Sequence, residues 1–191
     1  GGEWTTILKW SAAELGWTVG TSADGTTLYV IGNHDANTHR LLAVDLSSGE
    51  ETVLAEDAAY DVTEALVHPT GGHPQAAGIH RETLDWEVVD DEIRDDLDAV
   101  SAIQRGQFRI VSRDVADELW VVMYETDDAS ASFYLYERET RTHTLLFTSQ
   151  PQLDDATLAQ MEPVSFQSRD GLTIHGYLTL PVGEPPKGLP A

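Results

Sequence analysis

Apolar and polar residues alternate along much of the chain with a period of two. The alternation is clearest in TTLYVIGN (26–33), HRLLAVDL (39–46), ELWVVMYE (118–125) and SFYLYERE (132–139). Successive side chains of a β-strand point to opposite faces of a sheet, so this period predicts short strands with one buried face. We therefore expect a mainly β protein.

Turn-forming residues separate these strands and recur at a long interval. The segments SADGTT (22–27), HPTGGHP (68–74) and SRDVADE (112–118) each lie between two short apolar stretches, and they begin 46 and 44 residues apart. A repeat of about 40–50 residues that holds about four short strands is typical of β-propeller blades. The pattern predicts about three antiparallel four-stranded blades, which make a partial propeller.

One segment departs from the strand pattern. In DDEIRDDLDAVSAI (90–103), the apolar residues Ile93, Leu97, Val100 and Ile103 are separated by 4, 3 and 3 residues. This spacing places them on one face of an α-helix, and the acidic residues before them suit the positive end of the helix dipole. We therefore expect one short helix in the middle repeat.

The pattern changes again after residue 148. TSQPQLDDATLAQMEP (148–163) is rich in turn-forming and polar residues, which is typical of a linker. SRDGLTIHGYLTLP (168–181) alternates once more and predicts a C-terminal β-hairpin with the residues before it. We expect a partial propeller over 1–148, with blades at roughly 5–57, 58–106 and 107–148, then a linker over 149–163 and a separate unit over 164–191.

The chain is strongly acidic. It has 33 Asp and Glu residues against 11 Lys and Arg, a formal net charge of −22, and the acidic residues are spread along its length. Such a surface repels nucleic acid and anionic membranes, so we expect neither as a partner. With 191 residues, of which 41% are hydrophobic, the chain can still bury a core.

No segment of the chain has the pattern of an active site. There is no cysteine, which excludes a thiol nucleophile within these residues. GTSAD (20–24) lacks the second glycine of the G-x-S-x-G motif and no helix follows it, so Ser22 is interpreted as a hairpin residue. No nucleotide-binding glycine motif occurs, and we expect neither a catalytic residue nor a cofactor in this chain.

The histidines and the acidic cluster lack the spacing of metal ligands. His34, His39, His68 and His73 lie at turns or strand starts and form no H-x-x-x-H motif, so we expect no metal site. The acidic cluster lacks the glycine and the spacing of a calcium loop, and we interpret it as a solvated helix face. Its members are Asp90, Asp91, Asp95, Asp96 and Asp98.

Four stretches, taken together, are more specific than any single motif. They are GWTVGTSADGTTLYVIGN (16–33), HRLLAVDLSSGEETVLAEDAAYDV (39–62), SRDVADELWVVMYETDDASASFYLYERETRTHTLLFTSQPQL (112–153) and LAQMEPVSFQSRDGLTIHGYLTLPVGEPPKGLP (158–190). In this order they resemble the serine peptidases of the prolyl oligopeptidase family, especially the acylaminoacyl-peptidase and dipeptidyl-peptidase-like branch. The first three resemble propeller blades, and the fourth resembles the passage from the last blade into the first hairpin of an α/β-hydrolase domain.

The resemblance implies a serine-type peptidase that hydrolyses short peptides, as an aminopeptidase or an oligopeptidase, with the propeller limiting access to the active site. The family's nucleophile, acid and histidine match no position in this chain, which implies that they follow residue 191. We therefore expect the chain alone to be inactive, as the last blades and the truncated start (164–191) of the hydrolase domain of a longer enzyme.

The resemblance also implies a contact with the substrate. Acidic propeller residues in the dipeptidyl branch hold the free amino terminus of the peptide, and Glu125, Asp127 and Asp128 follow the strand WVVMY (120–124). We expect these three carboxylates to bind the amino end of a short peptide. An incomplete propeller also leaves strand edges open, which predicts self-association of the chain.

Two other functions stay open at this point. A stand-alone β-repeat module could bind a protein or a carbohydrate without enzymatic activity, although about three blades cannot close a ring that needs about 4–8. A protein made of a propeller and a hydrolase domain could also act on esters, because the fold does not fix which bond is cleaved.

Overall fold

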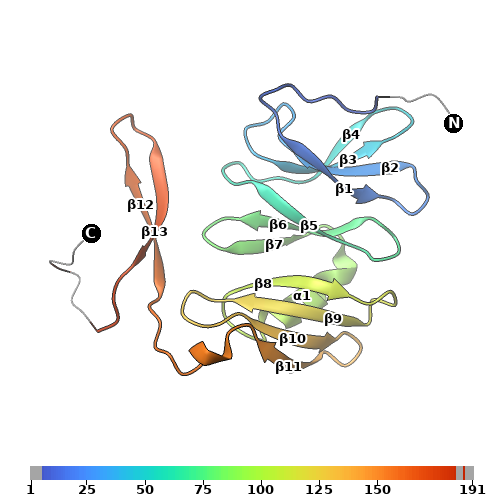
Figure 1. Cartoon of the computed structure of the whole chain (residues 1–191). Coiled ribbons are helices and arrows are strands. Elements are labelled where there is room, and N and C mark those ends of the chain that lie inside the picture. The colour runs from blue at the N-terminus through green and yellow to red at the C-terminus, as the bar shows by residue number, and fades with distance from the viewer. Residues whose placement is uncertain (1–5, 184–186, 188–191) are drawn as a thin grey trace.

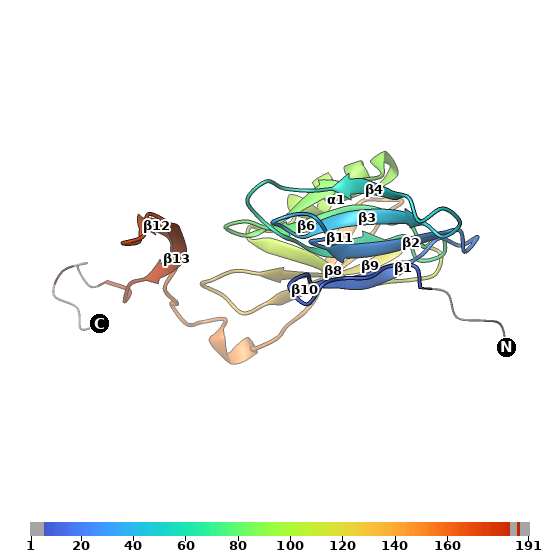
Figure 2. The ribbon, with the colours of Figure 1, turned by 90° about the horizontal axis from the view of Figure 1, so that it is seen from above.

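The computed structural model describes residues 6–183 and residue 187. These residues form four antiparallel sheets, one α-helix and two short 3-10 helices (Figure 1). Three sheets stand side by side, and the fourth, a hairpin near the C-terminus, stands apart from them (Figures 1 and 2). The predicted fold class is confirmed: the chain is mainly β, with three blade-like sheets, one short helix and a C-terminal hairpin, and the described sheets close no ring.

The first sheet has four strands in the order of the chain. They are β1 (Gly16–Thr21), β2 (Thr27–Gly32), β3 (Arg40–Asp45) and β4 (Glu51–Ala55). Its two central strands are covered on both faces, because alternate residues of β2 and β3 enter two different apolar clusters. In the β3–β4 turn, hydrogen bonds from the hydroxyl and backbone groups of Ser47 and Ser48 lower the pKa of the Asp45 carboxyl to about 2.

The second sheet has three strands, and a helix follows where the repeat predicts a fourth strand. The strands are β5 (Val62–Val67), β6 (Pro74–His80) and β7 (Leu84–Val88), and the 3-10 turn η1 (Asp91–Ile93) leads into α1 (Arg94–Ser101). The predicted apolar helix face is buried, with Ile93 and Val100 at 0% exposure and Leu97 at 5%. Asp90 caps η1, because its carboxylate accepts a hydrogen bond from the backbone nitrogen of Glu92 at 3.1 Å.

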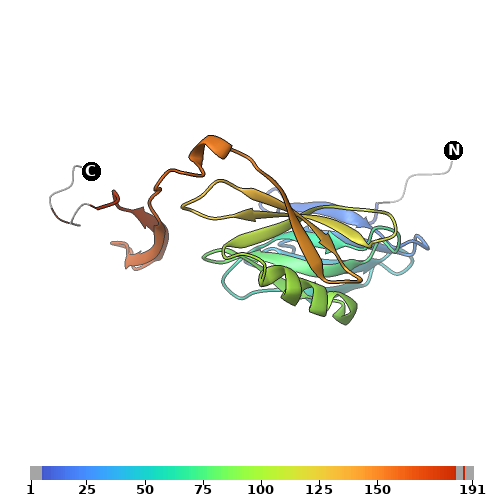
Figure 3. The ribbon, with the colours of Figure 1, turned by 90° about the horizontal axis from the view of Figure 1, so that it is seen from below.

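The third sheet again has four strands. They are β8 (Gln107–Arg113), β9 (Leu119–Glu125), β10 (Ser132–Glu137) and β11 (Thr142–Thr148). One face of β9 and β10 packs against α1 and the second sheet in the largest apolar cluster, which includes Trp120, Tyr124 and Tyr136. Seen from below, α1 runs along the outside of the stacked sheets (Figure 3).

Backbone contacts hold the first sheet against the second. Between the first two sheets, the backbone nitrogen of Ala23 donates to the carbonyl of Gly71 at 2.9 Å. Gly72 follows with φ of +72°, and a Cβ atom at this position would lie 2.1 Å from the carbonyl oxygen of Thr21. Only glycine fits here, because it tolerates positive φ and the neighbouring backbone leaves no room for a side chain.

The hairpin is joined to the third sheet by the linker, which contains the 3-10 turn η2 (Pro151–Leu153). Its strands are β12 (Met161–Gln167) and β13 (Thr173–Thr179), paired from Met161 opposite Thr179 to Gln167 opposite Thr173. The first strand thus begins within the last residues of the predicted linker. Several of its apolar side chains are exposed, among them Phe166 at 59% and Leu178 at 43%.

Within the described residues, no helix is both long and apolar enough to cross a membrane.

Candidate functional site

The loops at one end of the second and third sheets face the hairpin across a cavity of about 660 Å³. Its walls come from the β6–β7 loop, the segment before β8, the β9–β10 loop and the start of β12. A second cavity of about 340 Å³ lies beside it and shares four of its lining residues. The shared residues are His80, Glu82, Pro163 and Tyr177.

The larger cavity is negatively charged. Glu82, Glu125 and Asp127 contribute three carboxylates to its wall, and Arg105 contributes the one guanidinium among the lining residues. A partly enclosed site with an excess of carboxylates attracts a positively charged group. Two of the three acidic residues singled out from the sequence, Glu125 and Asp127, therefore meet at this cavity.

Glu125 lies at the end of β9 and is held by two neighbours on β8. Arg109 Nη1 donates to Oε2 of Glu125 at 2.5 Å, and Gln107 Nε2 donates to the same oxygen at 3.2 Å. The backbone of Glu125 is also closely packed against the residue that precedes β8. A Cβ atom on Gly106 would lie 2.4 Å from the carbonyl oxygen of Glu125. Gly106 also has φ of +107°, which disfavours any other residue.

Asp127 and Asp128 hold the linker against the third sheet. Asp127 accepts a hydrogen bond from the backbone nitrogen of Met161, and Asp128 accepts one from Nε2 of Gln160 at 2.9 Å. Arg105 pairs with both acids, through a hydrogen bond to Asp128 and at 3.7 Å from Asp127. The Gln160 amide, followed by the charge of Arg105, lowers the pKa of the Asp128 carboxyl below its ordinary value.

Asp128 does not line the larger cavity, although its partners Arg105 and Gln160 do. It lines another cavity of about 340 Å³ with residues of the linker and of β13, among them Leu158, Gln160 and Leu178. The structure therefore separates the three acids: Glu125 and Asp127 face one space, and Asp128 faces the next.

The second strand of the hairpin contacts the second sheet. The hydroxyl of Tyr177 donates to the backbone carbonyl of Glu82, and the ring of His175 meets the ring of Tyr60 edge to face at 6.2 Å. His175 is exposed on β13, and its described contact is the aromatic one with Tyr60. In both contacts the residue of the blades, Glu82 or Tyr60, lies in a loop between two strands.

The remaining candidate residues have structural contacts. Ser22 Oγ donates to Asp24 at 2.6 Å and accepts from the backbone nitrogen of Thr27 at 3.0 Å. Both contacts lie within the β1–β2 hairpin, in agreement with the interpretation of Ser22 as a hairpin residue. His68 and His73 stack on each other with ring centroids 5.1 Å apart.

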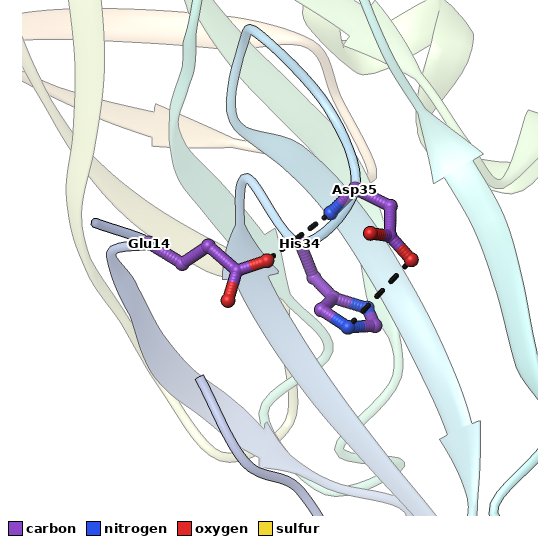
Figure 4. A group of neighbouring side chains, drawn as sticks. All are labelled: Glu14, His34 and Asp35. Atoms are coloured by element: carbon purple, nitrogen blue, oxygen red, sulfur yellow. Dashed lines mark hydrogen bonds and ion pairs between the residues drawn. The ribbon is translucent and has the colours of Figure 1, made fainter. Parts of the chain in front are cut away.

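Glu14, His34 and Asp35 form the one group of at least three possible ligands found close together among the described residues (Figure 4). Glu14 accepts hydrogen bonds from the backbone nitrogens of Ser11 at 2.6 Å and of Asp35 at 3.4 Å, and His34 lies 3.8 Å from the Asp35 carboxylate. Backbone donors therefore account for the position of Glu14, and the side chain of Asp35 is 87% exposed.

One member of the acidic helix cluster differs from the expected solvated face. Asp96 is 7% exposed, because Tyr136 donates to it at 2.9 Å and Arg138 binds it at 2.8 and 3.0 Å. A partner 42 residues away, which helical spacing does not reveal, makes this carboxylate part of the core.

Two curated relatives share extended sequence with the chain. Dipeptidyl aminopeptidase BIII of Pseudoxanthomonas mexicana is 38% identical over 162 residues, which are 85% of this chain and 24% of that protein. Dipeptidyl peptidase family member 6 of Caenorhabditis elegans is 29% identical over 125 residues, which are 65% of this chain and 17% of that protein. No protein-family model matches the chain.

Solved structures show the same fold at low sequence identity. Prolyl oligopeptidase B of Galerina marginata, bound to a 35-residue substrate, superposes with a TM-score of 0.58 at 13% identity, over 92% of this chain and 25% of that one. A structure from a study of two prolyl endopeptidases gives a TM-score of 0.59 at 13% identity, over 90% of this chain. The chain is related to dipeptidyl peptidases in sequence and shares the fold of prolyl oligopeptidases. It spans about a quarter or less of the length of the curated relatives it matches.

The site contains residues that the sequence alone did not reveal. Arg109 and Arg105 bind the predicted acids, and Glu64 binds Arg109 from the second sheet, 45 residues away along the chain. Only a weak signal in the sequence points to Arg109: it is the one charged residue of the otherwise apolar segment FRIV (108–111). Its partners become visible only when the two sheets are stacked.

Proposed function

We propose that this chain is part of a serine-type peptidase that acts at the free amino end of short peptides. The observation that carries the proposal is the 38% identity with dipeptidyl aminopeptidase BIII over 162 residues, which covers most of the chain. In this proposal the chain supplies the last propeller blades and the first hairpin of the hydrolase domain. The nucleophile, the acid and the histidine belong to a part of the enzyme outside these residues.

The proposed role of the blades is to limit access. Their loops and the hairpin line the cavity of about 660 Å³, so a peptide bound in it lies between the two. A stiff stack of sheets beside a catalytic centre admits an extended short peptide and rejects a folded domain. This arrangement supports selection by size.

The proposed role of Glu125, Asp127 and Asp128 is to bind the amino group of the substrate. Glu125 and Asp127 line the cavity directly. Asp128 binds Arg105 and so adds a negative charge near the cavity without lining it. An ammonium group that meets a partly desolvated carboxylate forms a charge-assisted hydrogen bond, which is stronger than a neutral one. We therefore expect Glu125 to contribute most and Asp128 least.

The test uses the full-length protein and two matched sets of dipeptidyl p-nitroanilides. One set has a free amino group and the other an acetylated one, and the proposal expects efficient cleavage of the free set alone. Cleavage of both sets with equal kcat/KM would contradict binding of the amino end. Turnover of p-nitrophenyl esters with no turnover of either peptide set would identify an esterase instead.

A pair of variants tests the acids. Glu125→Gln should lower kcat/KM for the free-amino set by about tenfold, the typical value of a hydrogen bond to a charged group. Glu139→Gln is the matched control, because Glu139 is an exposed residue of the β10–β11 turn. An equal effect of both substitutions would show that overall charge, and not the cavity, sets the preference.

Labelling with an active-site probe tests whether the nucleophile lies outside this chain. The 191-residue chain should not react with a fluorophosphonate probe, whereas the full-length protein should react with one equivalent. Stoichiometric labelling of the isolated chain would contradict the assignment of the nucleophile to another part of the protein.

A further inference from the structure

An ion triad connects the second and third sheets next to the cavity. Arg109 on β8 lies between two carboxylates: its Nε donates to Oε1 of Glu64 on β5 at 3.1 Å, and its Nη1 donates to Oε2 of Glu125 at 2.5 Å. All three side chains are partly covered, with exposures of 30% for Arg109, 32% for Glu64 and 39% for Glu125. The triad is therefore shielded from bulk water more than an ordinary surface pair.

The contacts of Glu125 are one-sided. Both of its described donors, Arg109 Nη1 and Gln107 Nε2, bind the oxygen Oε2. No residue within 6–183 donates a hydrogen bond to Oε1. A carboxylate can accept at both oxygens, so the side chain is held through one oxygen while the other keeps its capacity to accept.

The charge of the triad also favours a cation. A single Arg–Glu pair would be neutral, and its carboxylate would attract an ammonium group only weakly. Glu64 adds a second carboxylate to the same guanidinium, so the triad as a whole carries one negative charge at neutral pH. Arginine suits this position because its planar fork offers separate donors to two acceptors, which the single ammonium of lysine does not.

We infer that Arg109 is a positioning residue, and that Glu64 and Arg109 together present Oε1 of Glu125 to the amino group of a peptide in the cavity. This inference rests on the proposed function, in which Glu125 touches the substrate. Arg109 and Glu64 act through Glu125: one fixes its orientation, and the other keeps its negative charge effective.

The experiment measures KM and kcat separately in the full-length protein, with the free-amino and acetylated dipeptidyl p-nitroanilides. Arg109→Met releases Glu125, and we expect KM for the free-amino set to rise about tenfold while kcat changes little. Arg109→Lys should restore part of this loss, because it keeps the charge but not the fork. Arg141→Met is the matched control, since Arg141 forms an exposed pair with Asp95 far from the cavity.

Glu64→Gln gives the sharper test, because Glu64 does not line the cavity in the structure. Removal of its charge leaves a neutral Arg109–Glu125 pair, so KM for the free-amino set should rise and the rise should shrink at high salt. Glu64→Gln also decides the matter if Arg109→Met lowers the melting temperature so far that its kinetics cannot be measured.

The outcomes separate the two hypotheses. If the full-length protein cleaves neither peptide set, the proposed function fails. If it cleaves the free-amino set and Glu125→Gln raises KM, but Glu64→Gln and Arg109→Lys both behave like Arg141→Met, the proposed function stands and the positioning role of Arg109 is overturned.

Discussion

The indole nitrogen Nε1 of Trp120 donates a hydrogen bond to Oδ1 of Asp117 at 2.8 Å, and both side chains are buried. Asp117 also binds Arg113 and Arg138, whose guanidinium carbons each lie 4.9 Å from the centre of the Trp120 ring. Arg113 in turn donates to Gln75 of the second sheet at 2.8 Å. One carboxylate thus organises the contact between two sheets around a single aromatic ring.

Asp117→Ala should lower the free energy of unfolding by about 3–5 kcal/mol, because it leaves the buried guanidinium of Arg113 without its charged partner. The side chain of Arg113 is only 6% exposed, so water cannot replace the lost contact. Urea denaturation followed by tryptophan fluorescence measures the change. Glu139→Ala, at an exposed turn, should alter the unfolding free energy by less than about 0.5 kcal/mol. A small effect at both positions would contradict the central role of Asp117.

A comparison of Gly106→Ala with Gly25→Ala separates the energetic cost of an unfavourable φ from the cost of a steric clash. Both glycines have positive φ, but a Cβ atom on Gly25 meets nothing within 4 Å, whereas one on Gly106 would lie 2.4 Å from the carbonyl oxygen of Glu125. We expect Gly25→Ala to cost about 1 kcal/mol of unfolding free energy and Gly106→Ala clearly more. Thermal unfolding of the two variants is the measurement, and equal costs would show that the β9 end can shift away.

Replacement of Asp127 and Asp128 by alanine should loosen the linker. The acids bind the backbone nitrogen of Met161 and the side chain of Gln160, so their loss removes the described polar contacts of the linker end with the third sheet. Hydrogen exchange at the Met161 amide should become about tenfold faster. Asp155→Ala changes an exposed acid within the same linker and should leave this rate unaltered.

The pKa of the Asp45 carboxyl provides a pH test of the first sheet. Its value of about 2 lies below the ordinary 3.8, so the contribution of Asp45 to stability is complete above 3.8 and is lost as the pH falls toward 2. A carbon NMR titration should give a midpoint near 2. Because the Ser47 hydroxyl is the largest cause, Ser47→Ala should raise this midpoint toward 3.8. An unchanged midpoint would show that the remaining donors, the backbone nitrogens and the Ser48 hydroxyl, suffice.

The outer edge of the third sheet is expected to promote self-association. Strand β11 ends the sheet and exposes Leu145, Leu146 and Phe147 at 51%, 45% and 54%. An unpaired strand with apolar side chains pairs with other chains unless charge prevents it. The chain should sediment as a concentration-dependent oligomer, and Leu145→Lys with Phe147→Lys should shift it toward the monomer. Monomeric behaviour of the unaltered chain at high concentration would contradict this expectation.

The strands, the helix and the hairpin were predictable because each depends on residues close together in sequence. The period of two in HRLLAVDL (39–46) and the helical spacing from Ile93 to Ile103 are local patterns, and the structure follows both. The missing fourth strand of the second sheet has the same local origin, since the helix occupies the residues after β7.

The candidate site was predictable only in part. The sequence places Glu125, Asp127 and Asp128 together at the end of one strand, but it does not reveal which neighbours they bind. Arg109 and Glu64 are brought together by the stacking of two sheets, and Gln160 reaches Asp128 only because the linker folds back. Asp96, on α1, is buried for the same kind of reason, through Arg138 in the turn between β10 and β11.

The three apolar clusters of the blades contain no residue beyond Tyr136, and the hairpin enters none of them. A growing polypeptide leaves the ribosome from its N-terminus, and N-terminal parts fold first during synthesis. The blades can therefore complete these clusters while the hairpin is still inside the exit tunnel. The few polar contacts at Glu82, Asp127 and Asp128 then form last, on a surface that is already rigid.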